Sequence, residues 1–176
     1  VFDKDDLCND TPAGVMVDAN GCQVFSLPSN TFSVVVSSAS CIGQNSGRIR
    51  VSSSNSGNNY SYALNGVPSG QLNQSNNFTS EITDLSAGIY EICFTVDGIE
   101  NYSRCYSVSV TEPASLSAVT AVNYEKRELT VNLSGSKLYR VVLNGRQFTA
   151  ENTFMTMPLK MGKNTIEITT DLECQG

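Results

Sequence analysis

The sequence of 176 residues contains no histidine and no tryptophan. Histidine is the side chain whose ordinary pKa lies closest to neutral, so its absence excludes a Ser-His-Asp or Cys-His catalytic centre. It also excludes any zinc site built on imidazole ligands. Without tryptophan the broadest flat surface for stacking against a sugar ring is missing, although 7 Tyr remain.

Basic charge and long apolar runs are also scarce. The chain has 11 Lys and Arg against 17 Asp and Glu, which gives a formal net charge of -6. With no basic run, we expect no binding to nucleic acid or to anionic membrane surfaces. The longest apolar run, Val34–Val36, is too short to insert in a membrane. No signal peptide is recognisable, and the abrupt start and stop favour a piece of a longer secreted protein, covalently linked to neighbouring domains.

Six cysteines in a chain rich in Ser, Asn, Thr and Gly are the main positive feature of the composition. Disulfides form and persist in oxidising compartments, whereas cytosolic thiols are kept reduced. The sequence therefore predicts a secreted or cell-surface protein.

Short alternating runs dominate the chain after residue 31. In residues 47–51, Ile49 and Val51 share one face of a strand while Arg48 and Arg50 share the other. Residues 89–96 and 105–110 alternate in the same way, and Asp97 with Gly98 between them favours a hairpin turn. Period-two alternation with polar outer positions is typical of antiparallel sheets, and no stretch has a sustained helical period.

Two regions of the chain repeat at a spacing of about 75–79 residues. Residues 62–66 resemble residues 139–145, and residues 90–92 resemble residues 166–168. We therefore predict an all-β fold: two tandem Ig-like antiparallel β-sandwiches after a short, irregular, disulfide-closed segment. The predicted boundaries are 1–23 for the segment, 24–113 for the first sandwich and 114–176 for the second. The repeat pattern of the second sandwich stops before its last strand, so that strand either lies beyond Gly176 or is supplied or replaced by another segment.

The first 22 residues resemble the end of a thrombospondin type 3-like repeat. The matching positions are Val1, Asp3, Asp6, Cys8, Thr11-Pro12, Gly14 and Gly21-Cys22. This family binds Ca²⁺ through aspartates, so the resemblance implies that Asp3 and Asp6 are the last ligands of a partial calcium site. A solvated acidic linker is the alternative.

Residues 33–113 resemble the Ig-like repeats of bacterial gliding-motility adhesins of the SprB type. The matching features are Cys41, Gly43, Gly47, Tyr62, Leu64-Asn65-Gly66, Leu85 through Tyr90, and Val108 through Pro113. Such repeats occur in surface adhesins and in multimodular secreted enzymes that degrade polysaccharides. The resemblance therefore implies an extracellular module attached to other domains.

Two disulfide schemes follow for the six cysteines. Cys8 and Cys22 flank one turn-rich loop and form the first pair in both schemes. Cys93 and Cys105 lie at matching distances from the hairpin tip, which leaves Cys41 with Cys174. The adhesin repeats imply a rival in which Cys41 pairs with Cys105 and Cys93 with Cys174. In either scheme the cysteines are structural, because none has a partner that would activate a thiolate.

No constellation in the sequence predicts catalysis. A glycosidase needs two carboxyl groups that face each other across a cleft, and the spacing of the acidic residues establishes no such pair. We therefore expect a protein that is not an enzyme, without catalytic residues and without a cofactor other than the partial calcium site.

Candidate ligand-binding residues are exposed aromatic, amide and basic side chains near predicted turns. We expect Tyr60 beside Asn58 and Asn59 near one loop, and the outward-facing pair Arg48 and Arg50 to suit an acidic or sulfated sugar. The remaining candidates are Tyr102 and Arg104 near the last hairpin of the first repeat, and Tyr124, Lys126 and Arg127 at a turn of the second. The alternative for each candidate is that it is a solvated side chain or a core residue without a role in binding.

The sequence thus predicts a monomeric, non-catalytic accessory module that binds polysaccharide for an attached carbohydrate-active enzyme. The alternative is a structural spacer or a cell-surface adhesin repeat without a small ligand.

Overall fold

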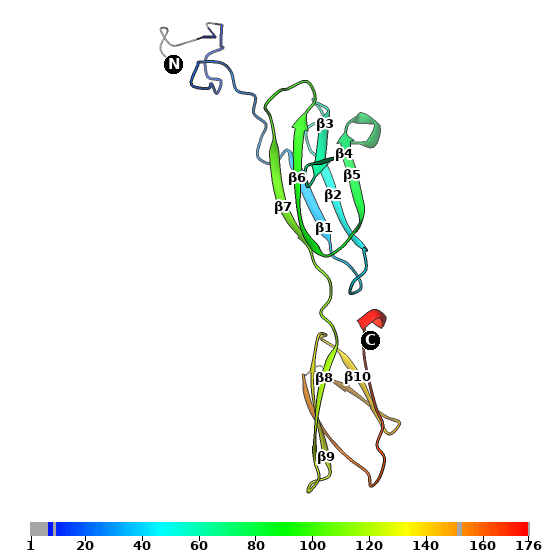
Figure 1. Cartoon of the computed structure of the whole chain (residues 1–176). Coiled ribbons are helices and arrows are strands. Elements are labelled where there is room, and N and C mark those ends of the chain that lie inside the picture. Colours follow the sequence, from blue (N-terminus) through cyan, green and yellow to red (C-terminus); the bar gives the residue numbers. More distant parts are fainter. Residues whose placement is uncertain (1–6, 9, 151–152, 176) are drawn as a thin grey trace. The chain divides into compact units, whose positions relative to one another are not determined.

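The computed structural model describes residues 7–8, 10–150 and 153–175 and is all-β (Figure 1). The described residues contain no α-helix, only two short 3₁₀ turns: η1 (Gln74–Asn76) and η2 (Glu173–Gln175). No helix in this part of the chain is long and apolar enough to cross a bilayer. The chain divides into two compact units, of which the second combines Val110–Gly176 with two stretches from the first half of the chain, Ser37–Arg48 and Thr83–Gly88. Each sandwich is described by itself.

The N-terminal segment has almost no regular structure and is closed by the Cys8–Cys22 disulfide. An isolated bridge joins Val17 to Gln23. The Asp18 carboxylate accepts hydrogen bonds from the backbone N–H groups of Asn20 and Cys22 at 2.8 and 3.0 Å. This carboxylate therefore fixes the turn before Cys22. So short a segment cannot form a core, and these hydrogen bonds stabilise it instead.

The first sandwich consists of a three-stranded sheet, β1-β2-β5, and a four-stranded sheet, β4-β3-β6-β7. Its strands are β1 (Phe32–Ser37), β2 (Gly47–Ser53), β3 (Tyr60–Leu64), β4 (Val67–Leu72), β5 (Thr79–Leu85), β6 (Gly88–Val96) and β7 (Arg104–Val110). The side chains that alternate inward from both sheets form the core, as period-two patterning requires.

An aromatic cluster occupies the core of the first sandwich. The ring of Phe32 stacks on that of Phe94 with centroids 4.2 Å apart, and the ring of Tyr60 meets Phe32 edge-on at 5.0 Å. Tyr106 of β7 meets Phe94 edge-on at 5.9 Å. The seventh strand therefore covers this core from the side, and the backbone N–H of Ala39 donates to the carbonyl of Thr111 at the ends of β1 and β7.

The second sandwich consists of two three-stranded sheets, β12-β9-β8 and β11-β10-β13. Its strands are β8 (Ser117–Asn123), β9 (Glu128–Ser134), β10 (Tyr139–Leu143), β11 (Arg146–Ala150), β12 (Phe154–Pro158) and β13 (Ile166–Thr170). The core is mainly aliphatic: Leu129, Val131, Leu133, Val141, Leu143 and Met157 are buried with Tyr139 and Ala150. Strand for strand, β8–β13 repeat the plan of β1–β6.

The register corrects one detail of the repeat alignment. Leu64 pairs with Ile92 in the first sandwich, and Leu143 pairs with Ile166 in the second. Ile166 and Ile168 are therefore the structural counterparts of Ile92 and Phe94, whereas the sequence alignment had placed Ile168 opposite Ile92. The two alignments differ by two residues, which is one full period of a strand. The same set of side chains therefore faces the core in both.

The structure pairs Cys93 with Cys105 and Cys41 with Cys174. These pairs match the scheme that follows from the hairpin geometry, and the rival pairing implied by the adhesin repeats is wrong. Cys93 lies on β6 and Cys105 on the adjacent strand β7, so the second bond spans two neighbouring strands on their outer face.

Candidate functional site

A hollow of about 460 Å³ opens at one end of the second sandwich. Its walls come from the end of β8, the turn after it, the start of β9, the end of β10, the loop between β12 and β13, and the start of β13. The lining residues are Val122, Asn123, Tyr124, Arg127, Leu129, Leu143, Leu159, Lys160, Met161, Gly162, Asn164 and Ile166. A volume of this size is within the usual range for small-ligand sites.

One asparagine holds the loop that forms the outer wall. The side-chain amide of Asn164 donates to the carbonyls of Lys160 and Gly162, and its oxygen accepts from the backbone N–H of Lys160 at 3.1 Å. The same oxygen accepts from the amide of Asn144 at 2.7 Å, which ties this loop to the end of β10. Asn164 is thus a positioning residue whose polar atoms are already bonded within the loop.

The opposite wall is the turn between β8 and β9. The side chain of Asn123 accepts from the backbone N–H of Lys126 at 3.0 Å, and Arg127 adopts a left-handed φ of 52°. The carbonyl of Arg127 accepts a hydrogen bond of 2.8 Å from the backbone N–H of Leu159. This bond brings the turn and the loop together, and so it places Arg127 and Lys160 on the same hollow.

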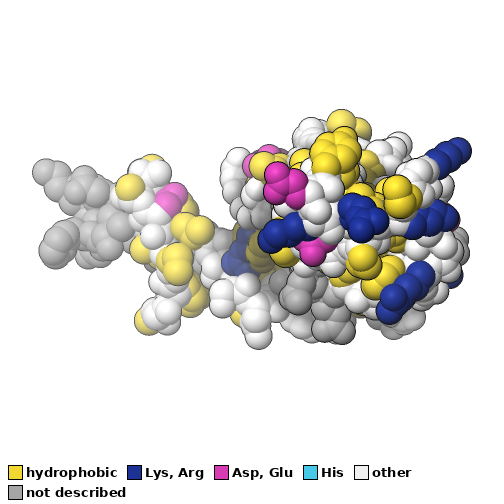
Figure 2. Space-filling model, turned by 90° about the horizontal axis from the view of Figure 1, so that it is seen from below, with side chains coloured by type: hydrophobic (Ala, Val, Ile, Leu, Met, Phe, Trp, Pro, Cys, Tyr) yellow, Lys and Arg dark blue, Asp and Glu magenta, His cyan; other side chains and the backbone are white. Residues whose placement is uncertain are grey.

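The chemistry of the hollow combines an apolar floor with an aromatic and basic rim. Leu129 and Leu143 belong to the buried core, whereas Tyr124 and Met161 are 86% and 83% exposed. Figure 2 looks onto this end of the molecule and shows Lys and Arg side chains spaced around hydrophobic ones. Among the described residues, neither Arg127 nor Lys160 has a carboxylate partner. The site therefore offers two basic side chains without a direct ion-pair partner beside apolar surface, with Glu125 and Glu128 close to Arg127 in the sequence.

The sequence identified one wall of this site and missed the other. Tyr124 and Arg127 line the hollow, and Lys126 lies in the same turn. Lys160 and Met161 were not predicted, because only the closure by Asn164 brings that loop to the turn. The available signal was the short run Lys160-Met161-Gly162-Lys163, in which a methionine stands between two lysines beside a glycine.

The prediction of an exposed Tyr60 is wrong. Tyr60 is 0% exposed and lies in the aromatic core of the first sandwich. It is the first residue of β3, next to the loop as predicted, but it pairs with Leu72 on one side and Val96 on the other and its ring lies in the core. The neighbouring Asn59 remains exposed and Asn58 is half-buried, but no aromatic ring accompanies them on the surface.

Tyr102 and Arg104, two predicted ligand residues, contact residues 25–28, the stretch that leads into β1. The Arg104 guanidinium donates to the carbonyls of Pro28 and Leu27 at 2.6 and 2.8 Å. The Tyr102 ring meets Phe25 edge-on at 5.3 Å. Burial raises the pKa of the Tyr102 phenol above its ordinary value, and the positive charge of Arg104 partly offsets this.

Arg48 and Arg50 point outward from β2, as the alternation predicts. The guanidinium of Arg50 lies 3.5 Å from the Glu81 carboxylate. Exposed ion pairs of this kind contribute little to stability. Both arginines are exposed and form part of the polar outer surface of β2.

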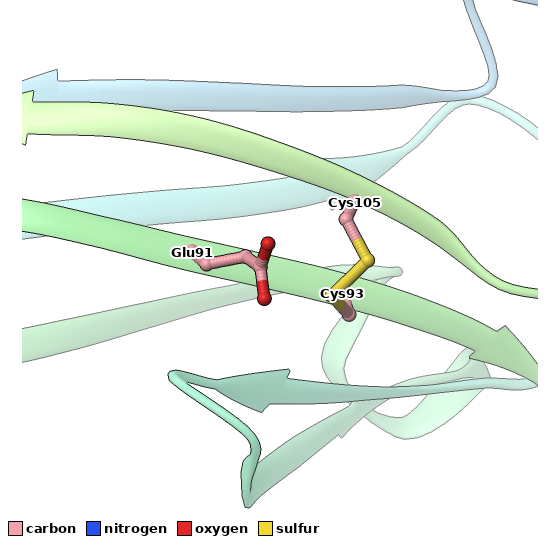
Figure 3. A group of neighbouring side chains, drawn as sticks. All are labelled: Glu91, Cys93 and Cys105. Atoms are coloured by element: carbon pink, nitrogen blue, oxygen red, sulfur yellow. A yellow bond between two sulfur atoms is a disulfide. The ribbon is translucent and has the colours of Figure 1, made fainter.

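A group of potential metal ligands lies on the first sandwich. Glu91, Cys93 and Cys105 lie close together on β6 and β7 (Figure 3). The two sulfur atoms are bonded to each other, and a disulfide sulfur lacks the thiolate charge that makes cysteine a strong metal ligand. While this bond is intact, the group offers only one carboxylate. Asp3 and Asp6, the predicted calcium ligands, lie outside the described residues.

Comparisons with known proteins do not assign this chain to a family. No protein-family model matches the sequence, and no curated protein matches it. Among solved structures, one described as "Central Fibronectin-III array of RIM-binding protein" is similar at 13% identity and a TM-score of 0.33, over 80% of this chain and 57% of that one. Another, of "Clostridium thermocellum CbhA fibronectin(III)-like modules", has 11% identity and a TM-score of 0.32, over 73% of this chain and 77% of that one. Similarities with TM-scores this low support no argument. The assignment as β-sandwiches rests on the strand order and the register.

Proposed function

We propose that this chain is a non-catalytic extracellular module whose second sandwich binds an acidic polysaccharide in the hollow at its end. It serves as an accessory to an attached carbohydrate-active enzyme of a longer secreted or cell-surface protein. The observation that carries the proposal is the joint presence of Tyr124, Met161, Arg127 and Lys160 on that hollow.

Each of these side chains supplies one part of sugar recognition. The exposed ring of Tyr124 and the thioether of Met161 provide apolar surface for the C–H face of a pyranose. Arg127 and Lys160 provide cationic donors for a carboxylate, and a guanidinium can bind it with two parallel hydrogen bonds. Because the whole chain is acidic, this local basic surface favours anionic sugars at one end of the molecule only.

The three disulfides support the extracellular part of the proposal. No described cysteine is left unpaired, which is typical of proteins that mature in an oxidising compartment.

Affinity electrophoresis tests the proposal. Native gels that contain alginate, a polymer of uronic acids, should retard the chain, and gels that contain a neutral β-glucan should not. We expect Tyr124→Ala and Arg127→Gln each to weaken retardation about tenfold, the usual effect of removing an anchor from a binding site.

Two matched controls separate a site from a general surface effect. Phe154→Ala removes another exposed aromatic ring of the second sandwich, and Arg140→Gln removes another exposed positive charge. Both variants should be retarded like the unmodified chain. Equal loss in the control variants would contradict a site at the hollow, and no retardation by either polymer would favour the alternative, a spacer or adhesin repeat without a small ligand.

A further inference from the structure

The four methionines of the chain differ in their access to solvent. Met161 is 83% exposed and Met16 is 65% exposed, whereas Met157 is 1% exposed. Met155 is half-buried and packs against the core of the second sandwich. A thioether reacts with a dissolved oxidant only where the oxidant can reach the sulfur. Exposure therefore makes Met161 and Met16 the reactive pair, ahead of Met155 and Met157.

Of these four residues, Met161 lines the hollow at the end of the second sandwich. The amide of Asn164 donates to the carbonyls of Lys160 and Gly162, which flank Met161, at 2.9 and 3.0 Å. Gly162 adopts a left-handed φ of 83° as the loop turns. The backbone at Met161 is thus held on both sides, and its exposed side chain stays on the rim of the hollow.

Met161 takes no part in the core of the second sandwich. Met157 belongs to that core, and Leu159 packs against it, whereas Met161 is in neither group of described residues. A polar group added at Met157 would be buried at a cost in stability. The same group added at Met161 stays in solvent and leaves the fold intact. The thioether of Met161 therefore contributes to the surface of the hollow and not to stability.

Oxidation of this thioether by hydrogen peroxide gives a sulfoxide and water. The sulfur lone pair attacks one peroxide oxygen, a sulfur–oxygen bond forms and the oxygen–oxygen bond breaks. The proton on the transferred oxygen moves to the departing hydroxide, which leaves as water. Sulfur loses two electrons and the peroxide gains them, so no further reagent is needed. The product is a polar, chiral side chain in place of a flexible apolar one.

A sulfoxide at Met161 changes both parts of the proposed sugar site. It removes the apolar surface that the thioether adds to the ring of Tyr124. It also adds a hydrogen-bond acceptor next to Lys160 and on the same hollow as Arg127. This oxygen competes with a sugar carboxylate for the two cationic donors. Both changes weaken binding of an acidic sugar.

We propose that Met161 is a modification site, at which oxidation of the thioether by a peroxide lowers the affinity of the hollow for acidic polysaccharide. This inference rests on the proposed function, because it regulates the same site. The change is reversible, since methionine sulfoxide reductases return each epimer of the sulfoxide to the thioether. The module therefore releases its polysaccharide under oxidising stress and binds it again after repair.

A peroxide titration of the whole chain tests the inference with two readouts. Peptide mapping by mass spectrometry follows the sulfoxide at each methionine, and affinity electrophoresis in alginate follows binding. We expect Met161 to be converted well before Met155 and Met157. Retardation should fall about tenfold as Met161 is converted, the usual effect of losing an anchor from a binding site. Treatment with the two methionine sulfoxide reductases should restore it.

Three variants, each compared with its own untreated sample, locate the effect. Met161→Leu lacks the sulfur, so peroxide should not change its retardation. Met16→Leu removes the other highly exposed methionine and should lose retardation about tenfold on treatment, like the unmodified chain. Met161→Gln carries a polar side chain of similar length and should be retarded weakly without any peroxide. The unfolding midpoint of the second sandwich should be the same before and after conversion of Met161.

Three outcomes would overturn the inference. They are oxidation of Met161 no faster than that of the buried Met157, unchanged retardation after full conversion of Met161, and an equal loss of retardation in treated Met161→Leu. Failure of the proposed function is recognised separately, because the untreated chain would then show no retardation by alginate. That result would also overturn the effect on binding, while the peptide map would still decide whether Met161 is the oxidation site.

Discussion

The two sandwiches use the same strand plan but are closed to different degrees. The first has an aromatic core, and β7 covers that core from the side with Tyr106 and Val110. The second has an aliphatic core with one buried aromatic residue, Tyr139, and its edge strands β8 and β13 leave inward side chains in solvent. Among the described residues, the first sandwich includes a seventh strand beside β6 and the second has no counterpart beside β13, which accounts for the difference in coverage.

This difference indicates where ligands have room to bind. In the first sandwich, Tyr60 enters the core and Arg104 bonds the carbonyls of Pro28 and Leu27, whereas Arg48, Arg50 and Asn59 remain exposed. In the second, Tyr124 and Arg127 remain at the rim of a hollow that continues from the uncovered core. The second sandwich, whose core is incompletely covered, is therefore also the one that carries the candidate binding surface.

The largest expected effect compares equivalent core positions of β6 and β13. Phe94→Ala removes a fully buried ring that contacts Phe32 and Tyr106, and we expect it to destabilise the first sandwich by about 3–5 kcal/mol. Ile168→Ala removes a half-buried side chain and should cost the second sandwich only about 1 kcal/mol. Chemical denaturation followed by NMR can report each sandwich separately. Equal losses at the two positions would contradict the difference in closure.

A second expected effect concerns the disulfide outside both sandwiches. The double variant Cys8→Ser with Cys22→Ser opens a loop with a sequence separation of 14 and should destabilise that segment by about 3 kcal/mol. Limited proteolysis should then cut between residues 8 and 22. Both sandwiches should keep their unfolding midpoints, because their cores lie elsewhere. A shift of either midpoint would show that the segment supports a sandwich.

The smallest expected effect uses two tyrosines at equivalent positions of β3 and β10. The Tyr139 hydroxyl donates to the carbonyl of Ser136 at 2.6 Å and accepts from its backbone N–H at 2.9 Å. The buried Tyr60 hydroxyl has no hydrogen-bond partner among the residues that the structure describes. We therefore expect Tyr139→Phe to destabilise the second sandwich by about 1 kcal/mol, and Tyr60→Phe to leave the first unchanged or slightly more stable. Equal destabilisation by both variants, in thermal unfolding, would contradict this contrast.

The sequence predicted the architecture because its local signals are strong. Alternating residues in β2, β6 and β7 determine the inward faces, and the repeat predicts a second unit on the same plan. The cysteine pairing followed from one hairpin, since the symmetric placement of Cys93 and Cys105 leaves only Cys41 for Cys174 once Cys8 and Cys22 are paired. These arguments use residues that are close in the sequence, or the two cysteines that remain once the others are paired. They need no knowledge of long-range contacts.

The candidate site was less predictable because it depends on contacts between loops. Tyr60 and Tyr62 share a strand face, so both face the core, but the sequence does not show how far Tyr60 lies from the end of the sheet. The bond from Leu159 to Arg127 and the brace by Asn164 bring Lys160 and Met161 to Tyr124. No local pattern in the sequence encodes those contacts.

The most direct test of the account is to locate sugar binding on both sandwiches in one experiment. An isotope-labelled chain is titrated with an alginate oligosaccharide while the shifts of its backbone amides are recorded, and a neutral cello-oligosaccharide serves as the control. We predict shifts that saturate in residues 122–129 and 159–166, with none in the first sandwich and none with the neutral sugar. Shifts centred on the first sandwich, or no saturable shifts at the hollow, would contradict the assignment of binding to the open unit.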